Sequence, residues 1–349
     1  MEQIAKIVRT QFGKEILASE QIHSGNSQVY KLTCGDDEHL IAKIYPDPNG
    51  DPRDRLGAEF GGLSFLWQHG IRSIPQPLYA DSDLRIGIFE FIRGESIPAH
   101  SVSADDITSA TSFLGDLASL IQFKDSFALP DASEACFSYL DYLESLQRRM
   151  DRYLDMPETT FLHGKARSFL QDELHPLFDS TRTWILRTLS DLGTSLNAKL
   201  EMNTRTLSPS DFGFHNCIRR EDKTLAFVDF EYFGWDDPAK MIADFIHHPA
   251  MPLASSLNRQ FHDQMFKIFK NDETLKIRVR LVYPVLGLKW CLIMLNEFLP
   301  GPLERRRNAN GSVPLEEVLG TQLTKARTKL GEVKALFEIP SIHTKLEPA

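Results

Sequence analysis

The segment Ser208-Pro209-Ser210-Asp211-Phe212-Gly213-Phe214-His215-Asn216 contains an aspartate and an asparagine in a D-x-x-x-x-N spacing around a glycine. A second acidic segment, Val228-Asp229-Phe230-Glu231, follows after a polar turn between two apolar runs. A tight glycine-bearing loop lets Asp211 and Asn216 converge, and a hairpin brings Asp229 back beside them. We therefore expect these three side chains to form one site.

Oxygen ligands of this kind suit phosphoryl transfer. That reaction needs one carboxylate that orients or deprotonates the attacking hydroxyl, and further oxygen atoms that hold Mg²⁺ against nucleotide phosphates. We assign the catalytic role to Asp211 and the metal-binding role to Asn216 and Asp229. Asp and Asn are also common in turns, so the assignment depends on partners elsewhere in the chain.

A lysine and a glutamate upstream are candidates for positioning the phosphates. Lys43 lies in the apolar run Leu40-Ile41-Ala42-Lys43-Ile44, where a buried ammonium group needs an anion. Glu59, on the next predicted helix, is a candidate ion-pair partner for Lys43. The alternatives are a Lys43 ammonium group that lies in water at a strand edge, and a surface cluster of Glu59 with Asp54 and Arg55.

The N-terminal part of the chain has the pattern of a small sheet with one helix. An amphipathic helix is expected at 54–69, and β-like runs occur at 20–23, 28–33, 39–45, 76–79 and 86–91. The loop before the second run contains Gly25, Asn26 and Ser27. Backbone N–H groups in such a loop can fold over the phosphates of a nucleotide.

Downstream, the pattern changes to long segments of helical periodicity. Helices are expected at 105–123, 137–153, 178–200, from 239 onward and at 315–337, with a polar connection at 155–168. Two short strands, 216–219 and 225–229, are expected to form the hairpin near Asp211. Asp237 is expected to cap a helix, and Asp244 to be a buried carboxylate bonded to the backbone.

Composition limits the classes of partner. The 349 residues carry a formal net charge of −9, which disfavours binding to nucleic acid. The longest apolar stretch, 282–295, contains Lys289 and is too short to cross a bilayer, so no membrane span is expected. The four cysteines are far apart, and the N-terminus lacks the pattern of a signal peptide. We therefore expect a cytoplasmic protein with reduced thiols.

Taken in order, these motifs resemble those of the aminoglycoside phosphotransferase and choline kinase family, which are small-molecule kinases with a protein-kinase-like fold. The matching segments are the nucleotide loop at 25–30, the phosphate lysine at 41–43 with its helix partner Glu59, the interlobe hinge at 88–95, the catalytic loop and the metal-binding Asp229. The resemblance implies ATP and Mg²⁺ as cofactors, with the backbone of Glu90 and Ile92 pairing with adenine. One departure is Pro209, which stands where the family's loop usually has a histidine that braces it.

The resemblance implies an α+β, two-lobed protein-kinase-like fold. The N-lobe, 1–95, would hold an antiparallel five-stranded sheet and bind the nucleotide. The C-lobe, 96–349, would be mainly helical and hold the catalytic loop, the metal site and the acceptor-binding helices. The implied reaction moves the γ-phosphoryl group of ATP to a hydroxyl of a small molecule, for which we favour a sugar or amino sugar. Pro209 leaves open the alternative of a non-catalytic, nucleotide-binding regulatory module.

Overall fold

A computed structural model describes residues 1–22, 27–35, 38–46, 53–300 and 314–338 of the chain. By its internal contacts the chain forms two compact units. The first consists of Met1–Ala135, Arg205–Asp236 and Ala250–Ile268, and the second of Cys136–Thr204, Asp237–Pro249 and Phe269–Ala349. The first unit therefore combines the predicted small sheet with both segments that carry the candidate site residues. The lobe boundary at residue 95 stays a prediction.

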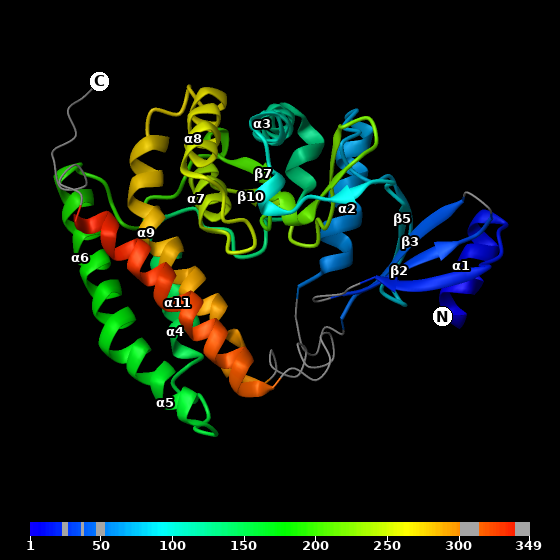
Figure 1. Ribbon diagram of the computed structural model, residues 1–349. Helices are drawn as coiled ribbons and strands as arrows, with labels where there is room; N and C mark the ends of the chain where they lie inside the picture. The colour runs from blue at the N-terminus through cyan, green and yellow to red at the C-terminus, as the bar shows by residue number, and fades with distance from the viewer. Residues whose placement is uncertain (23–26, 36–37, 47–52, 301–313, 339–349) are drawn as a thin grey trace. The chain divides into compact units, whose positions relative to one another are not determined.

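An antiparallel five-stranded sheet forms the N-terminal part of the first unit (Figure 1). Its strands are β1 (Ala18–Ile22), β2 (Gln28–Thr33), β3 (His39–Ile44), β4 (Pro77–Asp81) and β5 (Ile86–Glu90). They lie in the order β1-β2-β3-β5-β4, and α2 (Arg55–Gln68) connects β3 to β4. The predicted order of three strands, one helix and two strands is confirmed.

The helix α1 (Glu2–Phe12) precedes the sheet and was not predicted. Its Ile4, Ile7 and Val8 are buried in one apolar cluster with strand residues such as Leu32. Figure 1 shows α1 beside the strands. The spacing i, i+3, i+4 of these side chains is the usual signal of a helix with one buried face.

Within the described residues, two helices and five short strands continue the first unit. They are β6 (Glu95–Ser96), α3 (Ala104–Ser119), β7 (Thr206–Ser208), β8 (Cys217–Arg219), β9 (Leu225–Phe227), β10 (Gly234–Asp236) and α8 (Ser255–Ile268). β8 and β9 form the predicted antiparallel hairpin, in which Cys217 lies opposite Phe227. β6 pairs with β8, and β7 pairs with β10. These pairings hold the loop after β7 and the segment after β9 at fixed positions.

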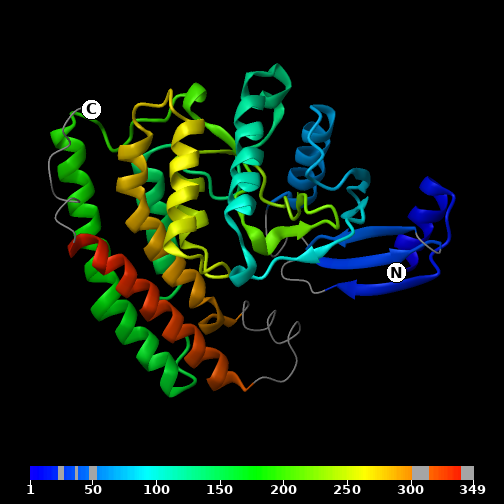
Figure 2. The ribbon, with the colours of Figure 1, turned by 45° about the horizontal axis from the view of Figure 1, so that its top comes forward.

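The second unit is helical. Its helices are α4 (Tyr139–Asp151), α5 (Phe161–Ser168), a π-helical turn (Phe169–Leu174), α6 (His175–Asp191), α7 (Pro238–His247), α9 (Leu275–Met294) and α11 (Leu315–Glu338). α9 packs against α4, α7 and α11, and Figure 2 shows α11 running alongside α9. The mainly helical character that was predicted for this part of the chain is confirmed.

Three predictions in the second unit need correction, of which the first is the helix at 178–200, because α6 begins at His175 and ends at Asp191. The stretch 155–168 is not only a connection, because it contains α5. Its Lys165 and Ser168 are exposed, while His163 and Ala166, three positions apart, are buried. Asp244 is buried as expected, but it accepts hydrogen bonds from the side chains of Lys289 and Trp290, not from the backbone. Asp237 caps α7 as predicted, accepting from the N–H of Ala239 at 2.8 Å.

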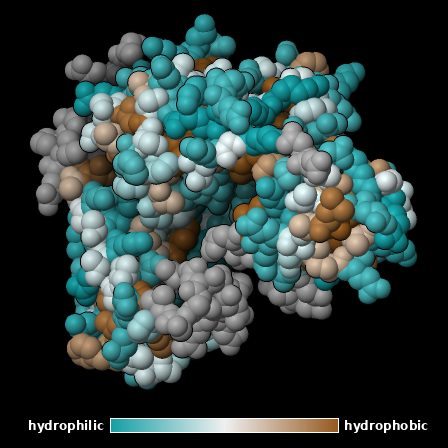
Figure 3. Space-filling view, turned by 45° about the vertical axis from the view of Figure 1, so that its right-hand side comes forward, coloured by the Kyte–Doolittle hydropathy of each residue, from teal (hydrophilic) through white to brown (hydrophobic). Residues whose placement is uncertain are grey.

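Hydrophilic residues cover much of the face drawn in Figure 3, and hydrophobic residues are exposed there in separate patches. Isolated exposed apolar side chains are normal on a protein surface. In the described ranges, no helix has both the length and the apolar character that a bilayer span requires.

Two adjacent glycines on α2 offer a test of how closely this helix packs. A Cβ added at Gly62 would lie 2.4 Å from Cδ1 of Phe233, whereas one added at Gly61 meets nothing within 4 Å. Gly62→Ala should therefore destabilise the protein by about 1–3 kcal/mol through overpacking. Gly61→Ala should be neutral or stabilise it by up to about 1 kcal/mol, because alanine favours the helix. Equal urea midpoints for the two variants would contradict the packing described here.

Candidate active site

Lys43 on β3 is bonded to two carboxylates from distant parts of the chain. Its Nζ lies 2.6 Å from Oε2 of Glu59 on α2 and 2.7 Å from Oδ1 of Asp229. Lys43 and Glu59 are only 7% and 3% exposed. The predicted ion pair is therefore present, and both alternatives, a solvated lysine and a surface cluster around Glu59, are wrong. The contact of Lys43 with a nucleotide phosphate stays a prediction.

The charges in this cluster are held by their neighbours. Burial alone would lower the pKa of Lys43, but the carboxylates of Glu59 and Asp229 outweigh it and raise that pKa above its ordinary value. Glu59 also accepts from the phenol of Tyr45 at 2.6 Å and from the N–H of Phe230 at 3.3 Å. Burial and the facing Glu59 hold the pKa of Tyr45 well above its usual value, so the phenol keeps the proton that it donates. Burial raises the pKa of Glu59 above its ordinary value, and the donors on both of its oxygens, with the Lys43 ammonium group, oppose that rise.

The loop that carries Asp211 is fixed by hydrogen bonds to its backbone and its side chains. Ser210 has a left-handed φ of 67°, and its N–H donates to Oγ of Ser208 at 3.0 Å. The Ser210 hydroxyl donates to the carbonyl of Ser133 at 3.2 Å. The side-chain amide nitrogen of Asn216 donates to the backbone carbonyl of Asp211 at 3.0 Å. Asp211 and Asn216 are thus brought together as the sequence predicts.

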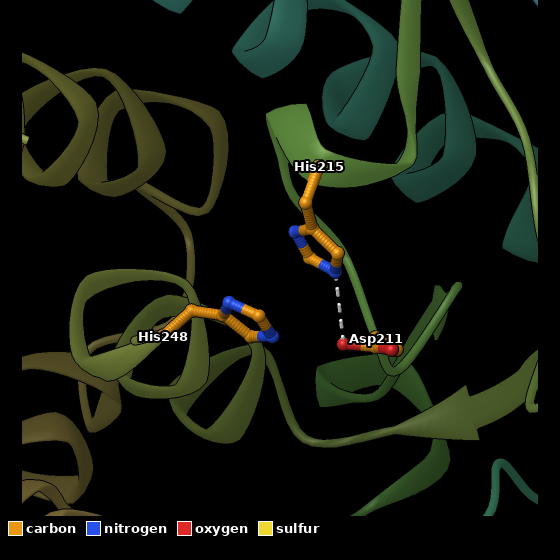
Figure 4. A group of neighbouring side chains, drawn as sticks. All are labelled: Asp211, His215 and His248. Atoms are coloured by element: carbon orange, nitrogen blue, oxygen red, sulfur yellow. Dashed lines mark ion pairs between the residues drawn. The ribbon is translucent and has the colours of Figure 1, made fainter. Parts of the chain in front are cut away.

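The carboxylate of Asp211 stays accessible. Its side chain is 35% exposed, and its Oδ1 lies 3.3 Å from Nε2 of His215. Figure 4 shows the two side chains pointing toward one another. His248, which the figure also draws, belongs to the second compact unit. His215 was not among the predicted site residues, although its spacing of four from Asp211 places it within reach of a tight loop.

Asn216 and Asp229 flank the β8–β9 hairpin. The N–H of Val228 donates to the carbonyl of Asn216 at 2.9 Å, which extends the strand pairing up to the residue before Asp229. The Asp229 side chain is 40% exposed, and Lys43 bonds only one of its oxygens. Because Asn216 uses its amide nitrogen on Asp211, its amide oxygen is the atom that can ligate a cation. Carboxylate and amide oxygens are hard ligands that fit Mg²⁺.

Of the predicted hinge residues, Glu90 ends β5 and Ile92 follows it. The N–H of Glu90 donates to the carbonyl of Gln76 at 2.9 Å, so only the Glu90 carbonyl is a candidate for pairing with adenine. The Glu90 carboxylate accepts from the N–H of Gln76 at 3.0 Å, which fixes the end of β5. Ile92 follows β5 and is buried. The adenine contacts of these two residues stay predictions.

Of the predicted nucleotide loop, Gly25 and Asn26 lie outside the described residues, and Ser27 lies within them. Ser27 is buried, and its hydroxyl donates to Oε2 of Glu231 at 2.8 Å. Oε1 of Glu231 accepts from the Arg55 guanidinium at 2.5 Å. Glu231 and Arg55 were not predicted as site residues.

Residues 19–263 match the model of the phosphotransferase enzyme family. The chain belongs to this family. Its fold is similar to that of a spectinomycin phosphotransferase solved with ADP and spectinomycin, with a TM-score of 0.63, 12% identity, and coverage of 95% of this chain and 98% of that one. A choline kinase from Cryptosporidium parvum has a TM-score of 0.62 and 13% identity, with coverage of 98% of this chain and 99% of that one. A choline kinase from Streptococcus pneumoniae has a TM-score of 0.58 and 14% identity, with coverage of 95% of this chain and 98% of that one. Among curated proteins, no sequence matches. These likenesses confirm the predicted kinase-like fold.

This member of the phosphotransferase enzyme family braces its loop without the usual histidine. The ring of Phe212, next to Asp211, lies 5.1 Å from that of Phe227 on β9. Phe227 in turn stacks on Phe113 of α3 at 4.5 Å. Phe230, next to Asp229, meets Phe113 edge-on at 6.2 Å. Aromatic packing therefore joins both acidic segments to α3, and Pro209 does not interrupt it.

Removing Lys43 tests the ion-pair cluster directly. Lys43→Ala leaves the buried Glu59 carboxylate without its nearest cation, which should cost about 3–5 kcal/mol of unfolding free energy. Glu59→Gln in the same chain removes the uncompensated charge, so the double variant should be more stable than Lys43→Ala alone. Urea titration measures both.

The matched control for this test is Lys14→Ala. Lys14 pairs with Glu38 at 3.0 Å on the surface, and its removal should change stability by less than about 1 kcal/mol. If Lys43→Ala is as mild as Lys14→Ala, the buried pair contributes nothing to the fold.

Proposed function

We propose that this chain transfers the γ-phosphoryl group of ATP to a hydroxyl of a small molecule. The observation that carries the proposal is the cluster of Lys43, Glu59 and Asp229, in which Asp229 follows the hairpin that comes directly after the Asp211 loop. Together with the Asp211 loop, this cluster places a cation for phosphates, oxygen ligands for a metal and the accessible carboxylate of Asp211 in one compact unit. Membership of the phosphotransferase enzyme family supports the same reaction class.

In the proposed mechanism each residue has one role. Asp211 orients or deprotonates the acceptor hydroxyl. The ammonium group of Lys43 has three N–H donors, of which two bond Glu59 and Asp229, so the third can donate to a phosphate. Asn216 and Asp229 would hold Mg²⁺, which neutralises phosphate charge when bound.

The rest of the nucleotide would be held mainly by backbone groups. We propose that the carbonyl of Glu90 and the N–H of Ile92 pair with adenine. The N–H groups of Gly25, Asn26 and Ser27 would contact the phosphates. Backbone contacts of this kind do not depend on side-chain chemistry, so they agree with a loop that carries a single glycine.

For the acceptor we propose a sugar or amino sugar. Structures of this fold include a spectinomycin phosphotransferase and choline kinases, whose names describe small acceptors with hydroxyl groups. The net charge of −9 agrees with a cationic acceptor but is also ordinary. Measuring ATP turnover with a panel of sugars, amino sugars, aminoglycosides and amino alcohols identifies the class of acceptor. ATP turnover that no member of the panel stimulates would count against the proposed acceptor.

Asp211→Asn tests the catalytic assignment. The substitution keeps the size of the side chain and removes its charge, so ATP should still bind while transfer to the acceptor falls by roughly 10²-fold or more. Thermal stability should change little, because the carboxylate is partly exposed and the loop is held mostly through its backbone.

The control for Asp211→Asn is Asp222→Asn, in an exposed turn of the same unit, which should leave transfer unchanged. Near-normal transfer by Asp211→Asn would mean that Asp211 is a turn residue. That result would favour a non-catalytic, nucleotide-binding regulatory module.

Calorimetric titration tests the metal ligands. ATP should bind more tightly with Mg²⁺ than with EDTA, because a divalent cation offsets the repulsion between the phosphates and the Asp229 carboxylate. Asp229→Asn should reduce this difference. Equal affinity in Mg²⁺ and EDTA for the unmodified chain would show that Asn216 and Asp229 are not metal ligands.

A further inference from the structure

Glu231 is a buried carboxylate for which the proposed reaction has no direct use. Its residue is 4% exposed, and both of its oxygens accept hydrogen bonds. Oε2 accepts from the hydroxyl of Ser27 at 2.8 Å, and Oε1 accepts from Nη1 of Arg55 at 2.5 Å. Ser27 and Arg55 are 6% and 5% exposed. Three segments that lie far apart in the sequence therefore meet at one carboxylate.

The contact with Arg55 makes this carboxylate part of the packing of α2. Arg55 and Glu59 are one helical turn apart, so they share one face of the helix. Glu59 accepts from the N–H of Phe230, and Arg55 donates to Glu231, the next residue. α2 is thus held at two points to the segment that begins with Asp229.

The contact with Ser27 adds the nucleotide loop to the same segment. Ser27 stands immediately before β2, which is antiparallel to the strand that carries Lys43. Its only hydroxyl hydrogen is directed to Glu231. The position of Ser27 relative to Lys43 and Asp229 is therefore set partly by a side chain 204 residues away in the sequence.

We propose that Glu231 is a positioning residue for the nucleotide phosphates, and that the hydroxyl of Ser27 acts through Glu231 and not as a phosphate ligand. The carboxylate fixes the backbone N–H of Ser27 relative to Lys43 and Asp229, so that these groups meet the phosphates together. This inference rests on the proposed ATP site. It predicts that weakening the contact affects recognition of phosphates and spares recognition of the base.

A double-mutant cycle tests the proposal by calorimetric titration of Mg²⁺-ATP into the full chain, Ser27→Ala, Glu231→Gln and the double variant. Ser27→Ala should weaken ATP binding about threefold to tenfold, the usual worth of one hydrogen bond. Glu231→Gln should weaken it at least as much, because Ser27 and Arg55 donate to different oxygens, and the amide replaces one of these oxygens with an NH2 group that faces a donor. The double variant should bind no more weakly than Glu231→Gln. Adenosine affinity, measured by competition with a fluorescent ATP analogue, should be unchanged in all variants.

Asp272→Asn is the matched control for loss of a buried carboxylate. Asp272 accepts from the buried Arg278 at 2.8 Å in the second unit. This variant should lower the urea midpoint without changing ATP affinity. An equal loss of ATP affinity in Asp272→Asn would show that destabilisation alone explains the effect of Glu231→Gln, and would overturn the proposal.

The other outcomes separate the two levels of inference. If the unmodified chain does not bind ATP, the proposed function fails, and the role of Glu231 fails with it. If it binds ATP and Glu231→Gln binds equally well, only the positioning role is overturned. Additive losses in the double variant would show that the Ser27 hydroxyl contacts the nucleotide itself. If Glu231→Gln does not fold, the ratio of ATP to adenosine affinity in Ser27→Ala decides, and an unchanged ratio overturns the proposal.

Discussion

The arrangement of this site depends on one interaction, the simultaneous bonding of the Lys43 ammonium group to Glu59 and Asp229. It joins β3, α2 and the segment after β9, none of which pairs with the others as neighbouring strands would. With Arg55 and Glu231 the cluster holds two cations and three carboxylates, so it carries one negative charge in excess. An anionic nucleotide adds to that excess, and a divalent cation bound with the nucleotide offsets part of the added negative charge.

Much of the fold follows from local patterns. The run around Lys43 predicts a buried strand because its neighbours are apolar and β-branched or small, and the helix at 54–69 is marked by its periodicity. Where the patterns failed, burial of a few side chains outweighed composition. In α5, His163 and Ala166 are buried among polar neighbours, and a polar segment with two buried positions resembles a connection. In α1, the apolar face is only as wide as Ile4, Ile7 and Val8.

A contact between two site residues could be predicted where the sequence around one residue requires a partner of opposite charge. It was missed where the partner is brought close only by the tertiary fold. An apolar strand makes an anion for Lys43 necessary, so Glu59 could be inferred. Nothing near Ser27 in the sequence requires Glu231, because an isolated serine is satisfied by water. His215 is similar, since its proximity to Asp211 depends on how tightly the loop turns. Gaps of this kind concern the partners Glu231 and His215, whereas the catalytic role of Asp211 and the metal-binding role of Asp229 stay predictions.

Pro209 is the departure that raised the non-catalytic alternative, and the structure limits what it can mean. A bracing histidine matters because it fixes the loop, and here that loop is fixed by other groups. Ser208 and Ser133 bond Ser210 on either side, and Phe212 extends an aromatic stack to α3. Loss of the histidine therefore does not imply loss of loop geometry. Whether the chain catalyses transfer depends instead on the chemistry of Asp211, whose carboxylate the loop leaves partly open to solvent.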